Sequence, residues 1–125
     1  MSPINPALRE VPDAMLTEYG FQPGRPPAPT WHCDDPGVEL VPLVALRVPL
    51  GRGLDPQRLR WPLGRIAAGH ALPAVPVFRE LDALVVLDGM HRVAVARALG
   101  FTHLPCLAVD EDEARDFYRY PEGQR

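Results

Sequence analysis

The chain contains no lysine, because all 13 basic residues among its 125 are arginine. Without lysine there is neither a P-loop clamp for phosphates nor a lysine Schiff base. Cysteine is also scarce, and two thiols, Cys33 and Cys106, are too few for a disulfide scaffold. Arginine, which holds phosphate in a rigid fork, is therefore the permanently charged side chain available for binding phosphate.

Long apolar runs and an excess of basic charge are missing as well. No run approaches the roughly 18 apolar residues that cross a bilayer, and the N-terminus lacks a signal-peptide pattern. The net charge of −3 argues against a surface for the nucleic-acid backbone, where positive charge collects. We expect a single cytoplasmic domain that has neither a membrane nor a nucleic acid as a partner.

A metal centre of the zinc type is not predicted. Several side chains are of the kind that ligates metals, but no pair of them has a recurring ligand spacing. They are His32, Cys33, His70, His91 and His103. Cys106 lies in the apolar run of residues 104–109, which favours a buried thiol.

Proline divides the chain, because eight of the 16 prolines lie in residues 1–37. Each proline fixes φ and lacks a donor, so this region cannot form a continuous ladder. We predict a proline-rich N-terminal extension over residues 1–37 and a domain over residues 38–125. A short helix over residues 12–19 should end at Gly20. Its apolar side chains would dock on the domain or on a second copy of the chain in a homodimer.

Strands and helices are predicted along the domain. Residues 39–48 have the pattern of a strand interrupted by Pro42, which indicates an edge position. Asp55 and Pro56 suit the N-cap and first position of a helix, which Pro62 should kink or divide in two. The remaining pattern predicts a strand at 74–78, a turn at 79–82, a strand at 102–109 and a helix at 111–118.

The most informative stretch is residues 83–100, which indicate a buried strand, a tight turn at Gly89 and a helix that ends at Gly100. The first N–H groups of such a helix have no internal partners, and its dipole attracts negative charge. Gly89 lets a ligand approach the backbone, and Arg92 offers a bidentate fork. These features predict a site for a phosphate ester.

From about residue 38 to residue 109 the chain resembles the ParB/sulfiredoxin superfamily. The resemblance rests on the order of four segments: VPLVALRV, AAGHALP, AVPVF and VVLDGMHRVAVARALGFTHLPCLAV. It implies an α/β (α+β) fold, a compact domain with a small mixed sheet and flanking helices. It also implies that the phosphates of ATP, ADP or CTP bind at the turn of Gly89, Met90, His91 and Arg92.

Met90 is where the sequence departs from this superfamily. The catalytic cysteine of sulfiredoxins looks equivalent to Met90, and a thioether cannot supply a thiolate. Chromosome-partitioning proteins have an acidic residue there, which helps with the metal and the triphosphate. We therefore expect neither sulfinic-acid reduction nor partition-type CTP hydrolysis. Separately, we expect no DNA-reading helix-turn-helix after Val109. The turn is most similar to that of the free-serine kinases, DGxHR.

Each residue of the turn has a functional and a structural interpretation. Asp88 could hold Mg²⁺ beside the phosphates, or it could cap the turn by accepting N–H bonds. His91 could donate to a phosphate oxygen or carry a proton, or it could be a structural histidine. Arg92 could bind phosphate or pair with a nearby acid such as Asp88.

The resemblance also implies residues outside the turn. Free-serine kinases use a glutamate base from an earlier segment, and Glu39 is the glutamate near the first strand. The structural alternative for Glu39 is a solvated side chain. Arg65 and His70 would belong to the opposite wall of the pocket, as a phosphate contact or a base, or would be exposed polar residues.

These inferences favour a nucleotide-binding protein that transfers a phosphoryl group from ATP or ADP to a small hydroxyl compound such as an amino acid. Arg92 and the turn amides would neutralise the phosphates, Asp88 would hold Mg²⁺, and Glu39 would accept the hydroxyl proton. The alternative is a non-catalytic module that senses a nucleotide or binds a protein. The sequence leaves open whether the chain is an enzyme, as a phosphotransferase or as a nucleotide hydrolase.

Overall fold

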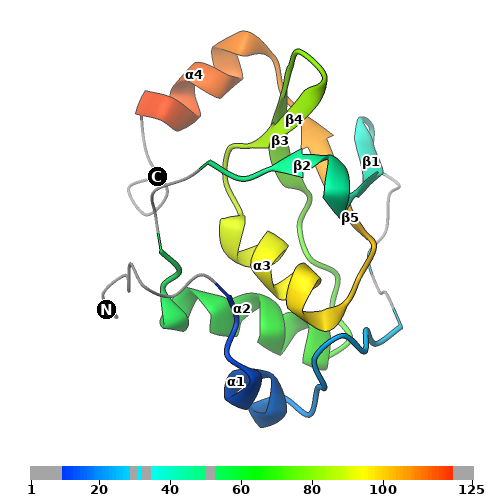
Figure 1. Ribbon diagram of the computed structural model, residues 1–125. Helices are drawn as coiled ribbons and strands as arrows, with labels where there is room; N and C mark the ends of the chain where they lie inside the picture. Colours follow the sequence, from blue (N-terminus) through cyan, green and yellow to red (C-terminus); the bar gives the residue numbers. More distant parts are fainter. Residues whose placement is uncertain (1–9, 29–30, 32–34, 50–52, 120–125) are drawn as a thin grey trace.

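The computed structural model describes residues 10–28, 31, 35–49 and 53–119. Its elements follow the chain in this order (Figure 1): α1 (Asp13–Glu18), β1 (Val38–Pro42), the 3₁₀ helix η1 (Leu43–Ala45), β2 (Leu46–Arg47), α2 (Pro56–Ala67), β3 (Val75–Glu80), β4 (Ala83–Val86), α3 (Met90–Leu99), β5 (His103–Ala108) and α4 (Glu111–Arg119). None of the described helices is long and apolar enough to cross a membrane.

The five strands form one mixed sheet in the order β1-β5-β3-β4-β2. The β1–β5 and β3–β4 pairs are antiparallel, whereas the β3–β5 and β2–β4 pairs are parallel. β3 and β4 form a hairpin whose turn is Leu81 and Asp82. The turn predicted over residues 79–82 is therefore shorter than expected, because Arg79 and Glu80 continue β3.

The strand predicted over residues 39–48 is two strands at opposite edges of the sheet. The edge position inferred from Pro42 is confirmed, but the prediction of one strand is wrong. After Pro42 the chain turns through η1, where Leu43 N–H donates to Thr102 O at 2.9 Å. β2 then pairs with β4 on the far side of the sheet from β1.

The helix predicted after Asp55 is present. The Asp55 carboxylate accepts the Gln57 N–H at 2.9 Å, and Pro56 lies in the first turn, where a missing N–H costs no helical bond. Pro62 lies inside α2 and does not start a second helix. Its ring is buried beside Leu63, so the proline belongs to the apolar face of α2.

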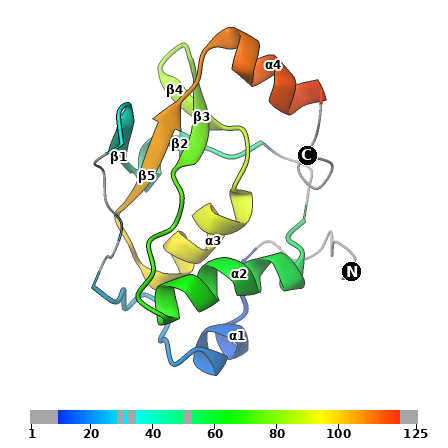
Figure 2. The same ribbon diagram turned by 180° about the vertical axis from the view of Figure 1, so that it is seen from behind.

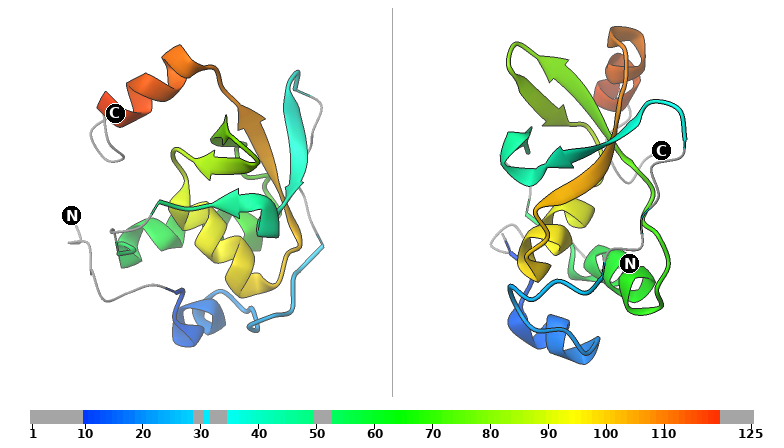
Figure 3. Two further views of the ribbon diagram at one scale, coloured as in Figure 1. Left: turned by 45° about the horizontal axis from the view of Figure 1, so that its top comes forward. Right: turned by 90° about the vertical axis from the view of Figure 1, so that its right-hand side faces the viewer.

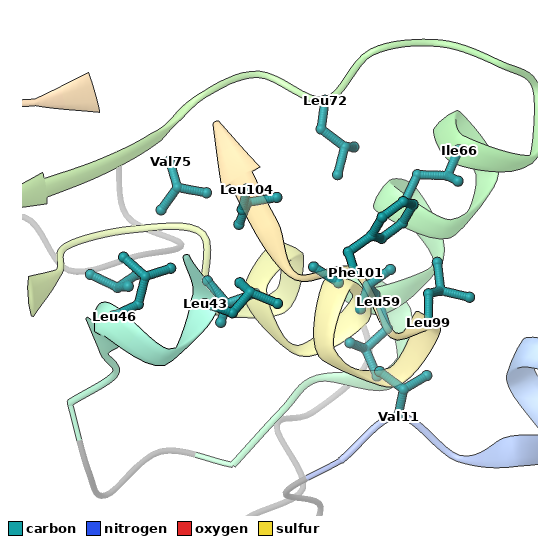
Figure 4. Packing of buried hydrophobic residues seen from close by; sticks show 14 of the residues in the cluster. Val11, Leu43, Leu46, Leu59, Ile66, Leu72, Val75, Leu99, Phe101 and Leu104 are labelled. Atoms are coloured by element: carbon teal, nitrogen blue, oxygen red, sulfur yellow. The ribbon is translucent and has the colours of Figure 1, made fainter. Parts of the chain in front are cut away.

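α2 and α3 lie together on one side of the sheet, and α4 contacts β3 at the opposite end (Figures 1 and 2). α1 lies beyond α2 and α3, on their side away from the sheet (Figure 3). The core fills the space between the sheet and the helices (Figure 4). Fully buried side chains such as Leu59, Leu99 and Leu104 each contribute about 1.5–3 kcal/mol.

Residues 10–28 of the proline-rich extension pack onto this core. The helix predicted over residues 12–19 is present as α1, and its Leu16 is fully buried in the apolar cluster. Gly24 N–H donates to Ala98 O at the end of α3, at 2.9 Å. This described part of the N-terminal region therefore packs on the core of its own chain.

Candidate functional site

The turn predicted at Gly89 connects β4 to α3. Gly89 has φ 91° and ψ 26°, a left-handed conformation, and it is an N-cap without a side chain to close the helix. Its C=O accepts the Val93 N–H at 3.1 Å. The N–H groups of a first helical turn have no partners within the helix. This arrangement binds anions in proteins.

Arg92 lies against this turn. Its Nη1 donates to Pro73 O at 2.8 Å and to Ala74 O at 3.1 Å, in the segment that leads into β3. Its Nη2 and Nε lie 2.7 and 2.8 Å from the point where a Cβ on Gly89 would be. Only glycine leaves room for the guanidinium here, so a permanent positive charge lies beside the start of α3.

A cavity of about 310 Å³ adjoins this guanidinium, and we call it the Arg92 cavity. It is lined by Arg58, Trp61 and Pro62 of α2, by Pro73, and by Gly89, His91 and Arg92. Among these described lining residues two are arginines and none is a carboxylate. Trp61 is 51% exposed, and the Arg65 guanidinium stacks 5.3 Å from its ring centroid. The cavity combines positive charge with an aromatic ring.

His91 is buried and joins the two helix starts. Its Nε2 accepts the backbone N–H of Asp55, the N-cap of α2, at 3.0 Å. This bond needs an Nε2 without a proton, so the neutral ring carries its proton on Nδ1. The structural role weighed from the sequence is therefore present in the fold. A contact from His91 to phosphate stays a prediction, and it would involve the Nδ1 side of the ring.

Asp88 also has the structural role weighed from the sequence, because its Oδ1 accepts the Gly89 N–H at 2.8 Å. Its magnesium role stays a prediction. A Mg²⁺ ion bound mainly through substrate phosphates needs only one or two protein carboxylates. In the part of the chain that the structure describes, no three His, Cys, Asp or Glu side chains gather as a metal site. His32 and Cys33 lie outside the described residues.

Three other predicted residues do not line the Arg92 cavity. Arg65 donates from Nε and Nη2 to Ala71 O, at 2.9 and 2.7 Å, and so holds the loop that follows α2. His70 is exposed in that loop. Met90 lines a different cavity, on the other side of α3. Binding of phosphate by these three residues stays a prediction that their positions do not favour.

Glu39 is exposed on β1, an edge strand. It pairs with Cys106 of β5, which pairs with Val75 of β3, so the three side chains share one face of the sheet. Neighbouring strands are about 4.8 Å apart. Glu39 therefore lies two strands from the segment that Arg92 binds, outside the lining of the Arg92 cavity. Its role as a base stays a prediction.

Cys106 is a buried thiol, as its apolar surroundings predicted. Its Sγ donates to Leu104 O at 3.5 Å. Burial raises the pKa of the thiol from its usual value near 9 to about 11, and the positive charge of Arg92 opposes part of this rise. At neutral pH Cys106 is therefore protonated, with the charge of Arg92 close to it.

Sequence reasoning missed Arg58 and Trp61. Both follow the helix start at Asp55, and residues three apart lie on one face of a helix. The sequence signal that could have indicated these two residues is an arginine and an aromatic ring three positions apart, directly after a strong N-cap. It marks the face of α2 that meets the start of α3 at the Arg92 cavity.

Comparison with known proteins identifies the fold. No protein-family model matches the chain, and no curated protein does. Sulfiredoxin from Arabidopsis thaliana matches with a TM-score of 0.55 and 20% identity, over 67% of this chain and 99% of that protein. SbnI with C-terminal truncation, from Staphylococcus aureus, matches with a TM-score of 0.53 and 23% identity, over 61% of this chain and 32% of SbnI. The chain thus spans about a third of that truncated SbnI chain. Its fold is ParB/sulfiredoxin-like, as its sequence motifs predicted.

Proposed function

We propose that the chain binds the phosphate groups of a nucleotide in the Arg92 cavity. The proposal rests on one observation: the start of α3 at Gly89 has no side-chain cap, and the Arg92 guanidinium lies against it. Backbone N–H groups and an arginine fork stabilise negative oxygens through charge-assisted hydrogen bonds, and the helix dipole adds attraction. Arg58 brings a second positive charge to the same cavity.

The other walls of the cavity suit the remaining parts of a nucleotide. Trp61 is half exposed, and stacking of a base on an aromatic side chain contributes about 1–3 kcal/mol. Because stacking tolerates every base, ATP, ADP and CTP are all candidate ligands. Asp88, beside Gly89, would hold Mg²⁺, which when bound neutralises charge on the phosphates.

The reaction proposed for this site is phosphoryl transfer from ATP or ADP to a small hydroxyl compound such as an amino acid. The hydroxyl oxygen attacks the terminal phosphorus, its proton passes to Glu39, and the nucleotide leaves one phosphate shorter. The resemblance of the turn to the free-serine kinases favours this reaction. A sensor without catalysis is the second candidate, favoured by the position of Glu39 outside the Arg92 cavity.

Calorimetric titration with ATP, ADP and CTP, with and without Mg²⁺, tests the binding. We expect at least one nucleotide to bind, and Arg92→Ala to weaken it by about 1.5–3 kcal/mol, which is about 10- to 150-fold. Failure of the folded protein to bind any of the three would contradict the proposal.

Arg79→Ala is the control for this titration. Arg79 is an exposed arginine of β3 that lies outside the Arg92 cavity. We expect Arg79→Ala to leave the affinity within a fewfold of the parent. An equal loss in both variants would mean that the weakening comes from a general change in charge and not from a lost phosphate contact.

A transfer assay then separates the enzyme from the sensor. The protein is incubated with the bound nucleotide, Mg²⁺ and free serine or other hydroxyl metabolites, and the phosphorylated product is measured. Transfer that disappears in Glu39→Gln while nucleotide affinity is retained would support the kinase. Binding without transfer to any hydroxyl compound would support the sensor.

A further inference from the structure

A second and larger cavity, of about 850 Å³, lies on the other side of α3, and we call it the Arg97 cavity. One wall is the face of α3 formed by positions three and four apart. The lining residues on this face are Met90, Val93, Ala94, Arg97 and Ala98. The other walls come from residues 46–49 at β2 and from the N-terminal segment at α1. No described residue lines both cavities, so the Arg97 cavity is separate from the proposed nucleotide site.

Part of the lining of the Arg97 cavity is apolar. Leu16 of α1 and Val93 of α3 are fully buried core residues, and both line it together with Leu46 and Leu54. Cavities that bury small organic ligands measure roughly 300–1,000 Å³. The Arg97 cavity therefore has the size of a small-molecule site, and its lining is apolar and polar in about equal parts.

Four charged residues also line this cavity. Arg47 is already neutralised by Glu80, at 3.2 Å. Among the described residues, Arg97 and the acids Glu10 and Asp13 have no ion-pair partner. The cation comes from the last turns of α3, and the two acids come from the N-terminal segment and the first turn of α1. Opposite charges therefore lie on different walls of one cavity whose remaining lining includes apolar side chains.

We propose that the Arg97 cavity binds a zwitterionic small molecule with an apolar body, of the hydrophobic dipeptide type. Its carboxylate pairs with Arg97, its ammonium group with Glu10 and Asp13, and its apolar side chains lie against Val93 and Leu46. Arg97, Glu10 and Asp13 are exposed. A simple organic anion would face two carboxylates, and an uncharged apolar molecule would leave all three charged groups without an ion-pair partner. A molecule with both charges gives an ion-pair partner to Arg97 on one wall and to the two acids on the other.

Titration with the dipeptide L-leucyl-L-leucine tests the inference. The backbone amide signals of the full chain are followed by two-dimensional NMR without any nucleotide, so the result is independent of the proposed function. We expect saturable shifts at Ala94, Arg97 and Ala98. N-acetylation of the dipeptide removes its ammonium group and amidation removes its carboxylate. Each should weaken binding severalfold, as the loss of an ion pair between exposed groups does.

Three variants complete the test. Arg97→Gln should weaken binding of the parent dipeptide. It should not weaken binding of the amidated dipeptide, which has no carboxylate to pair with Arg97. Arg79→Gln, at an exposed arginine of β3 outside both cavities, should leave binding unchanged. Ala94→Leu fills the cavity and should abolish the shifts while the rest of the spectrum stays native.

Two results would overturn the inference. The first is a folded parent protein whose α3 signals do not shift with the dipeptide at millimolar concentration. The second is equal binding of the parent, acetylated and amidated dipeptides, because that would show a purely apolar cavity without the paired charges.

Discussion

The two helices that follow strands β2 and β4 begin in opposite ways. α2 is closed by its own sequence, because the Asp55 carboxylate accepts the Gln57 N–H and Pro56 has no N–H to offer. α3 begins at Gly89, which has no side chain to cap it, and Arg92 lies against the turn. The start of α2 is capped by its own side chain, whereas the start of α3 has no side-chain cap, an arrangement that binds anions in proteins.

His91 connects these two helix starts, because its Nε2 accepts the backbone N–H of Asp55. This hydrogen bond therefore holds the start of α3 against the start of α2. Variants at each end should separate the two roles. Changes at Gly89 should affect ligand binding most, and changes at Asp55 should affect only the stability of the fold.

The largest effect is expected for Gly89→Ala. Alanine at position 89 would have to adopt the left-handed conformation of Gly89, which costs a residue with a side chain about 1–3 kcal/mol. Its Cβ would also displace the Arg92 guanidinium. We expect a lower free energy of unfolding together with a nucleotide affinity reduced by at least about tenfold, corresponding to one lost charged contact. Denaturant unfolding and calorimetry measure the two quantities.

Gly69→Ala is the control for this variant. Gly69 has φ 76°, but a Cβ there would meet nothing within 4 Å. It should share the loss of stability and keep the nucleotide affinity of the parent. If Gly69→Ala weakened the nucleotide as much as Gly89→Ala, the open start of α3 would not be the cause.

The next effect is expected at the connection between the helix starts. His91→Phe leaves the buried Asp55 N–H without its acceptor, and an unsatisfied buried donor costs about 1–3 kcal/mol. His91→Gln, whose amide oxygen can replace Nε2, should recover most of this loss. Chemical denaturation of the three proteins checks the order. A Phe variant as stable as the parent would show that the bond contributes nothing.

A smaller effect is expected at the closed end. Asp55→Ala removes the N-cap of α2 and should lower the free energy of unfolding by about 0.5–2 kcal/mol, whereas Asp55→Asn should retain most of it. Neither variant should change the nucleotide affinity. A loss of affinity in Asp55→Ala alone would mean that the two helix starts are not separable.

The smallest effect is a titration that reports the position of Arg92. Burial raises the pKa of the Cys106 thiol to about 11, and Arg92 opposes part of that rise. The folded state therefore holds a proton that the unfolded state loses first, so this group's contribution to stability falls as pH rises from about 9 to about 11. Arg92→Ala should raise the pKa of Cys106 further, measured by the ¹³Cβ shift of labelled cysteine in a Cys33→Ser background. An unchanged pKa would place Arg92 away from the thiol.

Local signals predicted much of this structure. Asp55 with Pro56 predicted the start of α2, and Gly89 with Gly100 predicted both ends of α3, because capping depends on neighbours in the sequence. The division of residues 39–48 into β1 and β2 was not predicted. It depends on pairing with β5 and β4, which are distant in the sequence.

In the candidate site, too, the local features were predicted and the features that depend on packing were not. The sequence predicted Gly89 and Arg92 as neighbours because one helical turn contains both. It could not show that Trp61 and Arg58 line the cavity, since that depends on how α2 packs against α3. The Arg97 cavity was also not predicted, because its walls come from three separate parts of the chain.

The open start of α3 can be tested most directly by following the backbone N–H signals of the protein during titration with ADP. We predict saturable shifts at Met90, His91 and Arg92, absent in Gly89→Ala and present in Gly69→Ala. If these three signals stay unchanged while the folded protein is mixed with the nucleotide, the start of α3 is not a phosphate site.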